Sequence, residues 1–356
     1  MGRHAEMNEK EGRNPDGRYG MGTVIVTAIG SFSAGAVIKS CKEAGLRVVG
    51  TDIYPAEYLP ESREVDRFVR VPRFDAGAAY VEAIRMLAEE EQAEGLLPLT
   101  DAELDVLNGN RAALSPAKLW TSPERAVETA RDKKKSTELA EQVFCELDPA
   151  LRKRVCTIPT KRLVDCPPDM LERGLPLILK PIDGRSSQGL YRINETQELK
   201  TVLAALKESG ISYLVQPLLK GRVVCVDTVR DRLGGTISIP REEFLRTHNG
   251  AGLSVRVFRD EVLERVCGRL SEAFGILGTV NYEWIHAEDG RYFFLECNPR
   301  FSGGTGFSRT AGFDVVKAHL SVFGAGNFAE SRVEPENPVK EMWIAKKYIE
   351  VITNRC

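Results

Sequence analysis

Three polar residues of different chemistry alternate with other residues late in the sequence. They are Glu296, Asn298 and Arg300 in the segment FFLECNPRFSGG, residues 293–304. Side chains of a β-strand alternate between its two faces, so an extended segment would place all three on one face. A carboxylate, an amide and a guanidinium on one face can bind a cation and contact an anion at the same time.

A second carboxylate can reach the same face. Glu283 lies in the strand-like segment LGTVNYEWIHA, which Asp289 and Gly290 separate from the strand that carries Glu296. This pattern predicts a β-hairpin in which the two carboxylates face each other. Carboxylate and amide oxygens are ligands that Mg²⁺ prefers, so the hairpin predicts a magnesium site at Glu283, Glu296 and Asn298, which Mn²⁺ could also occupy. The alternative is a solvent-exposed acid pair that repels weakly.

A magnesium site of this kind needs a phosphate, and a partner for phosphate occurs earlier in the sequence. Lys180 ends an apolar strand in LPLILKPIDGRSSQGL, residues 175–190, and a loop with Gly184 and Gly189 follows it. A lysine can pair with phosphate oxygens, and backbone N–H groups of such a loop can close over them. The loop lacks the GxxxxGK[ST] spacing, which excludes a Walker-type P-loop.

The composition is typical of a soluble, multidomain protein. The chain has 356 residues, 42% of them hydrophobic and 28% charged, with 49 basic and 51 acidic residues. Near-neutral charge implies no nucleic-acid or membrane surface, and no apolar stretch has the length of a membrane span. We expect a cytoplasmic protein that is compatible with a homodimer. The eight cysteines form no CxxC pair, so we expect reduced thiols and no zinc site.

The order of the predicted elements divides the chain. Residues 1–20 are nearly free of apolar side chains and are expected to be a disordered leader. A strand, a glycine turn, a helix and a second strand ending in Asp52 then predict a βαβ unit within a parallel α/β domain. Gly30 and Gly35 do not form GxGxxG, which favours a tight turn over a dinucleotide site. Mixed strands and helices after residue 118 predict α+β architecture.

The order of these segments resembles the ATP-grasp superfamily. The resemblance rests on Asp132-Lys133, LILKP with DGRSSQG, YLVQPLLKG, and NYE followed by LECNPRFSGG. LPLTDAELDVL and ECNPRFSGGTGFSRTAGFD most resemble single-unit relatives of the carbamoyl phosphate synthetase large subunit, and the resemblance covers about residues 22–325. It implies an α/β and α+β protein with a Rossmann-like pre-ATP-grasp domain at residues 21–117. A two-subdomain ATP-grasp fold would follow at residues 118–214, with the lid loop, and 215–330, with a C-terminal extension at 331–356.

The resemblance also implies roles for individual residues. Glu283, Glu296 and Asn298 match magnesium ligands, and Arg300 matches the arginine that stabilises the transferring phosphoryl group. His248 matches a residue beside the reacting acyl phosphate. The residues that match the ATP site are Lys133 and Lys180 for phosphate, Ser186, Ser187, Gln188 and Gly189 for the lid, and Gln216, Pro217, Leu218 and Leu219 for the adenine hinge.

Three positions depart from the pattern. Relatives usually carry glutamate where Gln216 and Val223 stand, and valine cannot hold ribose hydroxyls. The synthetase carries an arginine where this chain has Gly303, followed by Gly304. This difference predicts space for a carboxylate substrate larger than bicarbonate.

The function that follows from the resemblance is an ATP-dependent carboxylate–amine ligase. It would form an amide or peptide bond from small-molecule carboxylate and amine substrates through an acyl phosphate, with ATP and Mg²⁺ as cofactors. One alternative is a carbamoyl phosphate synthetase-like enzyme that makes carboxyphosphate, and another is a nucleotide-binding module without turnover. The identities of the acid and the amine are left open.

Overall fold

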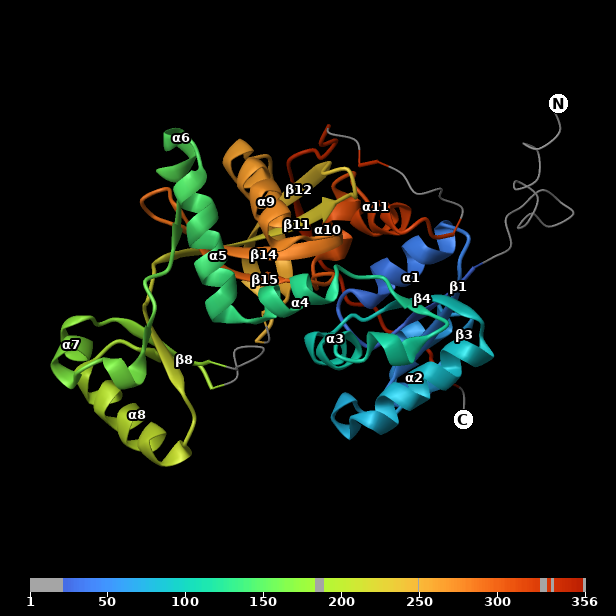
Figure 1. The fold of residues 1–356 in the computed structure, drawn as a ribbon, viewed down its shortest axis with the longest axis horizontal. Coiled ribbons are helices and arrows are strands. Elements are labelled where there is room, and N and C mark those ends of the chain that lie inside the picture. The colour runs from blue at the N-terminus through green and yellow to red at the C-terminus, as the bar shows by residue number, and fades with distance from the viewer. Residues whose placement is uncertain (1–21, 183–188, 249, 327–331, 334–335, 355–356) are drawn as a thin grey trace, which may run out of the picture.

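The computed structural model describes residues 22–182, 189–248, 250–326, 332–333 and 336–354 of the chain. These residues contain three β-sheets with helices packed against them (Figure 1). Within the described ranges, no helix combines the length and the apolar character needed to cross a membrane.

The first sheet has five parallel strands in the order β3-β2-β1-β4-β5. Its strands and helices are β1 (Thr23–Val26), α1 (Ala34–Glu43), β2 (Arg47–Asp52), β3 (Arg67–Arg70), α2 (Ala78–Glu90), β4 (Ala93–Leu97), α3 (Asp101–Asn108) and β5 (Lys118–Leu119). The central strand β1 reads TVIV and is buried throughout, as expected for a parallel sheet with both faces covered. The predicted α/β domain is therefore confirmed.

The glycine turn of this domain is closed by Asp52. The backbone N–H of Gly30 donates to Asp52 Oδ2 at 2.9 Å, and that of Tyr54 donates to Oδ1 at 3.1 Å. Asp52 is buried. Its carboxylate therefore serves the turn itself, which is the structural role that the glycine spacing favoured.

The second sheet is the largest and lies at the centre of the molecule (Figure 1). Its seven strands run in the order β16-β13-β12-β11-β14-β15-β6, and every neighbouring pair except β15 and β6 is antiparallel. They are β6 (Val155–Thr157), β11 (Gly221–Arg230), β12 (Thr236–Arg246), β13 (Gly252–Val257), β14 (Gly278–Ala287), β15 (Tyr292–Asn298) and β16 (Met342–Ala345). The predicted hairpin is β14 and β15, with Gly290 of its turn at φ +81°.

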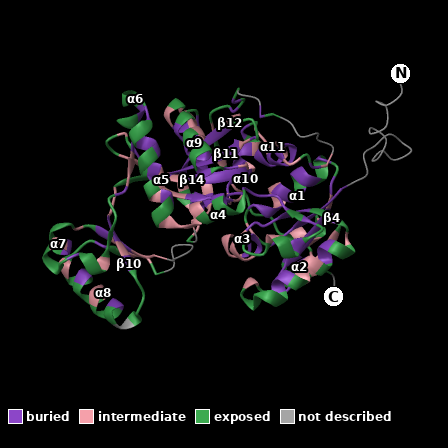
Figure 2. Cartoon of the chain, viewed as in Figure 1, coloured by how far each residue is buried: buried purple, intermediate pink, exposed green. Residues whose placement is uncertain are grey.

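Each face of this central sheet packs against a different set of helices. One face forms a core with α4 (Glu124–Arg131), α5 (Lys133–Glu146) and α9 (Glu261–Phe274). The other packs on α10 (Thr305–Thr310) and α11 (Val315–Val322), and this core continues into α1 of the first domain. Figure 2 shows the buried residues running through both regions. The first domain and the central sheet thus share one hydrophobic core.

The third sheet belongs to a small subdomain at the far end of the molecule from the first sheet (Figure 1). Its antiparallel strands run in the order β7-β10-β8-β9 and have their own core. The elements are β7 (Lys161–Arg162), α7 (Pro168–Arg173), β8 (Leu177–Pro181), β9 (Tyr191–Ile193), α8 (Thr196–Ser209) and β10 (Tyr213–Pro217). The preceding helices α4 and α5, α6 (Pro149–Arg152) and strand β6 pack with the central sheet instead.

His319 joins three parts of the fold through a buried imidazole. Its Nδ1 accepts from the backbone N–H of Thr279 at 2.9 Å, so Nε2 carries the proton and donates to the Trp120 carbonyl at 3.1 Å. The ring also lies between Phe301 and Phe323, with centroids 4.9 and 4.8 Å away. Burial lowers the pKa of His319 to about 4, so the ring stays neutral in the folded protein over most of the pH range.

The lowered pKa of His319 predicts that the free energy of unfolding falls on acidification. His319→Gln should lack this contribution. The unfolded histidine takes up a proton below about pH 6.5 whereas the folded one does so near pH 4, so acidification through this window favours unfolding. Its contribution is at most about 1.4 kcal/mol per pH unit. Urea unfolding of wild type and variant between pH 6.5 and 4 measures the difference in slope. Equal slopes would contradict the prediction.

Candidate active site

The predicted site residues lie in cross-strand rows on one face of the central sheet. Direct pairing aligns the row Arg241, Cys225, Glu283 and Glu296 across strands β12, β11, β14 and β15. The next row contains Asp227, Asn281 and Asn298. Residues directly opposite each other on neighbouring strands share a face, so both rows point to the same side. Charged and polar side chains are thereby gathered on one patch of an otherwise apolar sheet.

Glu283 and Glu296 face each other as the hairpin predicts. Asn298 Nδ2 donates to Glu296 Oε1 at 3.1 Å and to Glu283 Oε1 at 3.4 Å. Burial and then the negative charge of Glu296 raise the pKa of Glu283, which reaches about 7. The two close carboxylates therefore carry negative charge that the neighbouring side chains neutralise only in part.

A divalent cation fits this donor set. In the part of the chain that the structure describes, no group of three or more His, Cys, Asp or Glu side chains could hold a metal by itself. Glu283 and Glu296 can supply two carboxylates, and Asn298 can supply an amide oxygen once its side chain is rotated. Mg²⁺ usually binds one or two carboxylates together with substrate phosphates and water. Two carboxylates and one amide oxygen leave coordination positions for these ligands, so the set suits Mg²⁺.

Two lysines approach the acid pair from other elements. Lys180 lies on β8 of the small subdomain, and Lys133 is the first residue of α5. Burial and then the charge of Lys133 lower the pKa of Lys180, the charge of Glu296 opposes them, and the net pKa is about 8. The charges of Lys133 and Glu296 therefore both act on the Lys180 ammonium. Asp132 caps α5 by accepting from the Lys134 and Lys135 backbone N–H groups, which fixes where the helix starts.

The predicted adenine hinge lies at the end of β10. Gln216 is buried, and its Nε2 donates to Thr160 Oγ1 at 2.7 Å. The backbone N–H of Leu218 donates to the Pro176 carbonyl at 2.9 Å, whereas Pro217 and Leu219 are half-buried. The segment thus connects the small subdomain to the central sheet in a defined conformation.

The structure describes only one of the four predicted lid residues, and it places His248 at the surface. Ser186, Ser187 and Gln188 lie outside the described residues. Gly189 has φ +69°, and a Cβ there would come within 2.9 Å of Pro181 Cγ, so this position requires glycine. His248 is exposed in the turn after β12, and no hydrogen bond or ion pair with a described residue holds its side chain.

Arg300 is held by a residue of the first domain that sequence reasoning did not select. Its Nη2 donates to Asp101 Oδ2 at 2.7 Å and lies 3.5 Å from Asn298 Oδ1. Arg131 Nη1 also pairs with Asp101, at 3.1 Å from Oδ1. Asp101 begins α3 directly after the N-cap Thr100, so the helix start fixes the carboxylate. In LPLTDAELDVL, an apolar strand ends at a helix N-cap, and this pattern could have identified Asp101 as a candidate site residue.

Arg241 is the second group that sequence reasoning missed. Its guanidinium is buried, with Nη1 2.8 Å from Asp227 Oδ2, Nη2 donating to Ser302 Oγ at 3.0 Å and Nε 3.4 Å from Glu243 Oε1. Arg246 continues this chain of charges, since Nε lies 2.6 Å from Glu243 Oε2 and Nη2 lies 3.4 Å from Glu283 Oε2. An ionic network thus extends from Asp227 to the predicted metal ligands.

The two glycines after Arg300 have different surroundings, and only Gly304 differs from the prediction. A Cβ at Gly304 would lie 2.5 Å from Arg241 Nε, so Gly304 makes room for this guanidinium and not for substrate. A Cβ at Gly303 would lie 3.4 Å from the Cβ atoms of Ala251 and Phe32, which bound the space beside it. Lys346 Nζ also donates to the Gly303 carbonyl at 2.8 Å. A positive charge is therefore present beside Gly303 although the arginine of the relatives is absent.

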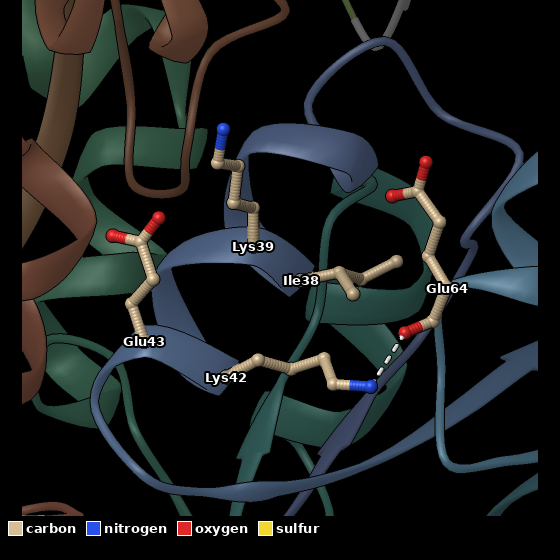
Figure 3. A pocket seen from close by; sticks show the side chains of 5 residues that line it. All are labelled: Ile38, Lys39, Lys42, Glu43 and Glu64. Atoms are coloured by element: carbon tan, nitrogen blue, oxygen red, sulfur yellow. Dashed lines mark hydrogen bonds between the residues drawn. The ribbon is translucent and has the colours of Figure 1, made fainter.

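A surface pocket on α1 is separate from this site. Ile38, Lys39, Lys42, Glu43 and Glu64 line it (Figure 3). Lys42 Nζ donates to the Glu64 carbonyl and to Asp66, and Glu43 pairs with Arg309 and Lys317. Since these charges are already satisfied within the chain, the pocket has less capacity for a ligand than the acid pair.

Comparison with known protein families agrees with the resemblance. Residues 211–347 match the family described as "ATP-grasp in the biosynthetic pathway with Ter operon", and residues 24–117 match "PylC-like, N-terminal domain". The second part of the chain is therefore similar to ATP-grasp proteins, and the first part is similar to PylC-like N-terminal domains. The recognition and the fold class predicted from the sequence are confirmed.

Individual relatives are distant. The N-terminal section of the carbamoyl phosphate synthase large chain of Methanopyrus kandleri is 23% identical over 84% of this chain and 54% of its own length. The D-alanine–D-alanine ligase of Pseudomonas fluorescens is 24% identical over 48% and 57%, respectively. The chain thus spans little more than half the length of either relative. The crystal structure of a biotin carboxylase–β,γ-ATP complex from Campylobacter jejuni has a TM-score of 0.67 at 18% identity, covering 84% of this chain and 70% of its own.

The role assigned to Gly304 predicts unequal effects of two alanine substitutions. Gly304→Ala should destabilise the protein by about 1–3 kcal/mol, because ion pairs and burial prevent the Arg241 guanidinium from moving away. Gly303→Ala, the matched control, places a methyl group at ordinary contact distance and should cost less. Urea unfolding at pH 7 measures both. Equal effects of the two substitutions would show that Arg241 does not constrain this turn.

Proposed function

We propose that this chain is an ATP-dependent carboxylate–amine ligase. The observation that carries the proposal is the convergence of unlike charges on one face of the central sheet. Glu283, Glu296 and Asn298 form an oxygen-rich cluster, Arg300 lies beside it, and Lys180 approaches from another sheet. Anionic and cationic groups that meet in a partly buried site suit a phosphate-bound divalent cation.

The residues of the chain would divide the work as follows. Glu283, Glu296 and Asn298 would hold Mg²⁺, and Lys133 and Lys180 would pair with phosphate oxygens of ATP. Mg-ATP would supply the phosphoryl group and part of the charge neutralisation. Arg300 would contact the transferring phosphoryl group, in an orientation fixed by Asp101. The hinge at Gln216, Pro217, Leu218 and Leu219 would receive adenine, and the lid at Ser186, Ser187, Gln188 and Gly189 would cover the phosphates.

The proposed reaction has two balanced steps. A carboxylate oxygen of the substrate attacks the γ-phosphorus, and ADP leaves as the acyl phosphate forms. An amine nitrogen then attacks the acyl carbon, phosphate leaves with the bonding electrons, and the nitrogen loses a proton to give the amide. His248 stands in the loop that would lie beside the acyl phosphate. The family match to ATP-grasp proteins and the similarity to a D-alanine–D-alanine ligase support an ATP-dependent ligase reaction.

Carboxyphosphate chemistry is the second candidate, and Lys346 favours it more than the sequence alone suggests. The ammonium beside Gly303 can contact a small anion, which removes part of the argument for a large carboxylate. The similarity to a carbamoyl phosphate synthase section supports the same candidate. A screen of ADP release from Mg-ATP with bicarbonate, and with small carboxylates and amines alone and in pairs, separates the two. Bicarbonate-dependent release without an amide product would replace the ligase proposal.

Glu296→Gln tests the metal site. It removes one negative charge at nearly constant volume, so the fold should persist while substrate-dependent ADP release falls at least tenfold, a barrier increase of about 1.4 kcal/mol. Circular dichroism checks the fold, and a coupled assay measures ADP. Retention of more than about a tenth of the wild-type turnover would exclude Glu296 as an essential ligand.

Asp101→Asn tests the positioning of Arg300. The amide keeps the size of the side chain but loses the charge that pairs with the guanidinium, so kcat should fall several-fold. ATP affinity measured by calorimetry should change little, because Asp101 would not contact the nucleotide. Asp105→Asn is the matched control, because Asp105 lies on the same helix as Asp101 and its carboxylate pairs with Arg131 instead. An equal loss of kcat in both variants would mean that helix packing, and not Arg300, is responsible.

A further inference from the structure

The segment after β16 brings Lys346 to the side of the central sheet that carries the acid pair. The ladder with β13 continues past the strand, since the backbone N–H of Lys346 donates to the Leu253 carbonyl at 2.8 Å. Met342 and Ile344 of β16 pack against the core on the side of α10 and α11. Strand alternation places Lys346 on this same side and Lys347 on the opposite one.

The surroundings of the Lys346 ammonium are aromatic, and no described carboxylate forms an ion pair with it. Nζ donates to the Gly303 carbonyl, and it lies 4.9 Å from the ring centroid of Phe32 and 5.4 Å from that of Phe307. Among the described residues, no carboxylate lies within ion-pair distance of this nitrogen. An ammonium can donate three hydrogen bonds, so the single carbonyl leaves donor capacity for another acceptor.

Three separate parts of the chain build this environment. Phe32 comes from the glycine turn of the first domain, Gly303 follows the predicted phosphoryl-contacting arginine, and Lys346 comes from the edge of the central sheet. Phe32 is half-exposed at 49%, so the cluster is open to solvent. Burial and then the charge of Arg241 lower the pKa of Lys346, Glu243 opposes them, and the net pKa is about 8. A cation that is partly desolvated and not paired has an unmet preference for an anion.

We propose that Lys346 binds an anionic group on one of the two reactants. This group takes no part in the bond-forming steps. This inference rests on the proposed ligase function, and it names the class of substrate. One of the two reactants carries a carboxylate in addition to its reacting group. The reactant is either a dicarboxylic acid that is phosphorylated at its other end or an amino acid that acts as the amine. Phe32 and Phe307 lie beside the ammonium and leave it accessible to a ligand from the solvent side.

The alternative is that Lys346 only ties β16 to the Gly303 loop. Two features make the ligand-binding role distinguishable. Lys346 and Lys347 are adjacent and belong to the same strand extension, yet Lys347 is exposed and points to the other face. Lys347→Met is thus a matched control for loss of charge in this segment. Lys346→Arg retains the charge and can still donate to the carbonyl, whereas Lys346→Met keeps only the aliphatic packing.

Substrate pairs that differ only in the spectator carboxylate test the proposal. The acids are succinate and butyrate, and the amines are alanine and ethylamine, each assayed for ADP release with Mg-ATP. Lys346→Met should raise the KM of the charged member of one pair by about tenfold or more, with little change for its uncharged analogue. Succinate-specific loss identifies a diacid, and alanine-specific loss identifies an amino acid. Lys346→Arg should recover most of the affinity, and Lys347→Met should resemble wild type.

A second readout does not depend on turnover. Acetylation of Lys346 by acetic anhydride, followed by mass spectrometry and normalised to Lys347, should be reduced several-fold by succinate or by alanine but not by butyrate or ethylamine. If no pair gives ADP release in wild type, this protection alone decides whether an anion subsite exists, and the wider substrate screen decides the ligase proposal. Equal KM increases for charged and uncharged analogues, or absence of protection, would overturn the inference.

Discussion

A cluster of opposite charges that includes two predicted metal ligands, and is buried at Asp227, Arg241 and Glu243, is the constraint on which the rest of the structure depends. Its members are Asp227, Arg241, Glu243, Arg246, Glu283 and Glu296. Removing such charges from water is costly, and the cost is recovered only if every partner is held at hydrogen-bonding distance. The antiparallel register of β12, β11, β14 and β15 supplies this alignment, because a slip of one residue would turn the whole set to the other face. The register therefore determines the site as well as the sheet.

Sequence patterns were sufficient to predict the parts of the site whose residues lie close together along the chain. Alternation along one strand placed Glu296 and Asn298 on a common face, and the Asp289-Gly290 turn placed Glu283 opposite Glu296. These relations involve residues separated by fewer than twenty positions. The strand and turn that hold them have strong local preferences. The association of Lys180 with this cluster, in contrast, was inferred from the need of a magnesium site for phosphate and from the family resemblance, and not from spacing.

The residues that were missed depend on contacts between distant segments. Asp101 meets Arg300 across 199 positions, and Lys346 meets Gly303 only because β16 joins the edge of the sheet. Nothing near Arg241 in the sequence indicates that its guanidinium will fill the space left by Gly304. The glycines were interpreted as space for a ligand because glycine permits close approach of any group, and the sequence does not say which group approaches.

The core shared by the first domain and helices α10 and α11 has a consequence for the synthesis of the chain. Val37 and Ile38 of α1 pack in the same cluster as Phe307 and Val316, which are translated almost three hundred residues later. At about 5–20 residues per second, the apolar side of α1 has no native cover for tens of seconds after it leaves the ribosome. The first domain can form its own core, which includes Ile25, Val49 and Ile84, but it completes the burial of α1 only after α10 and α11 have been synthesised.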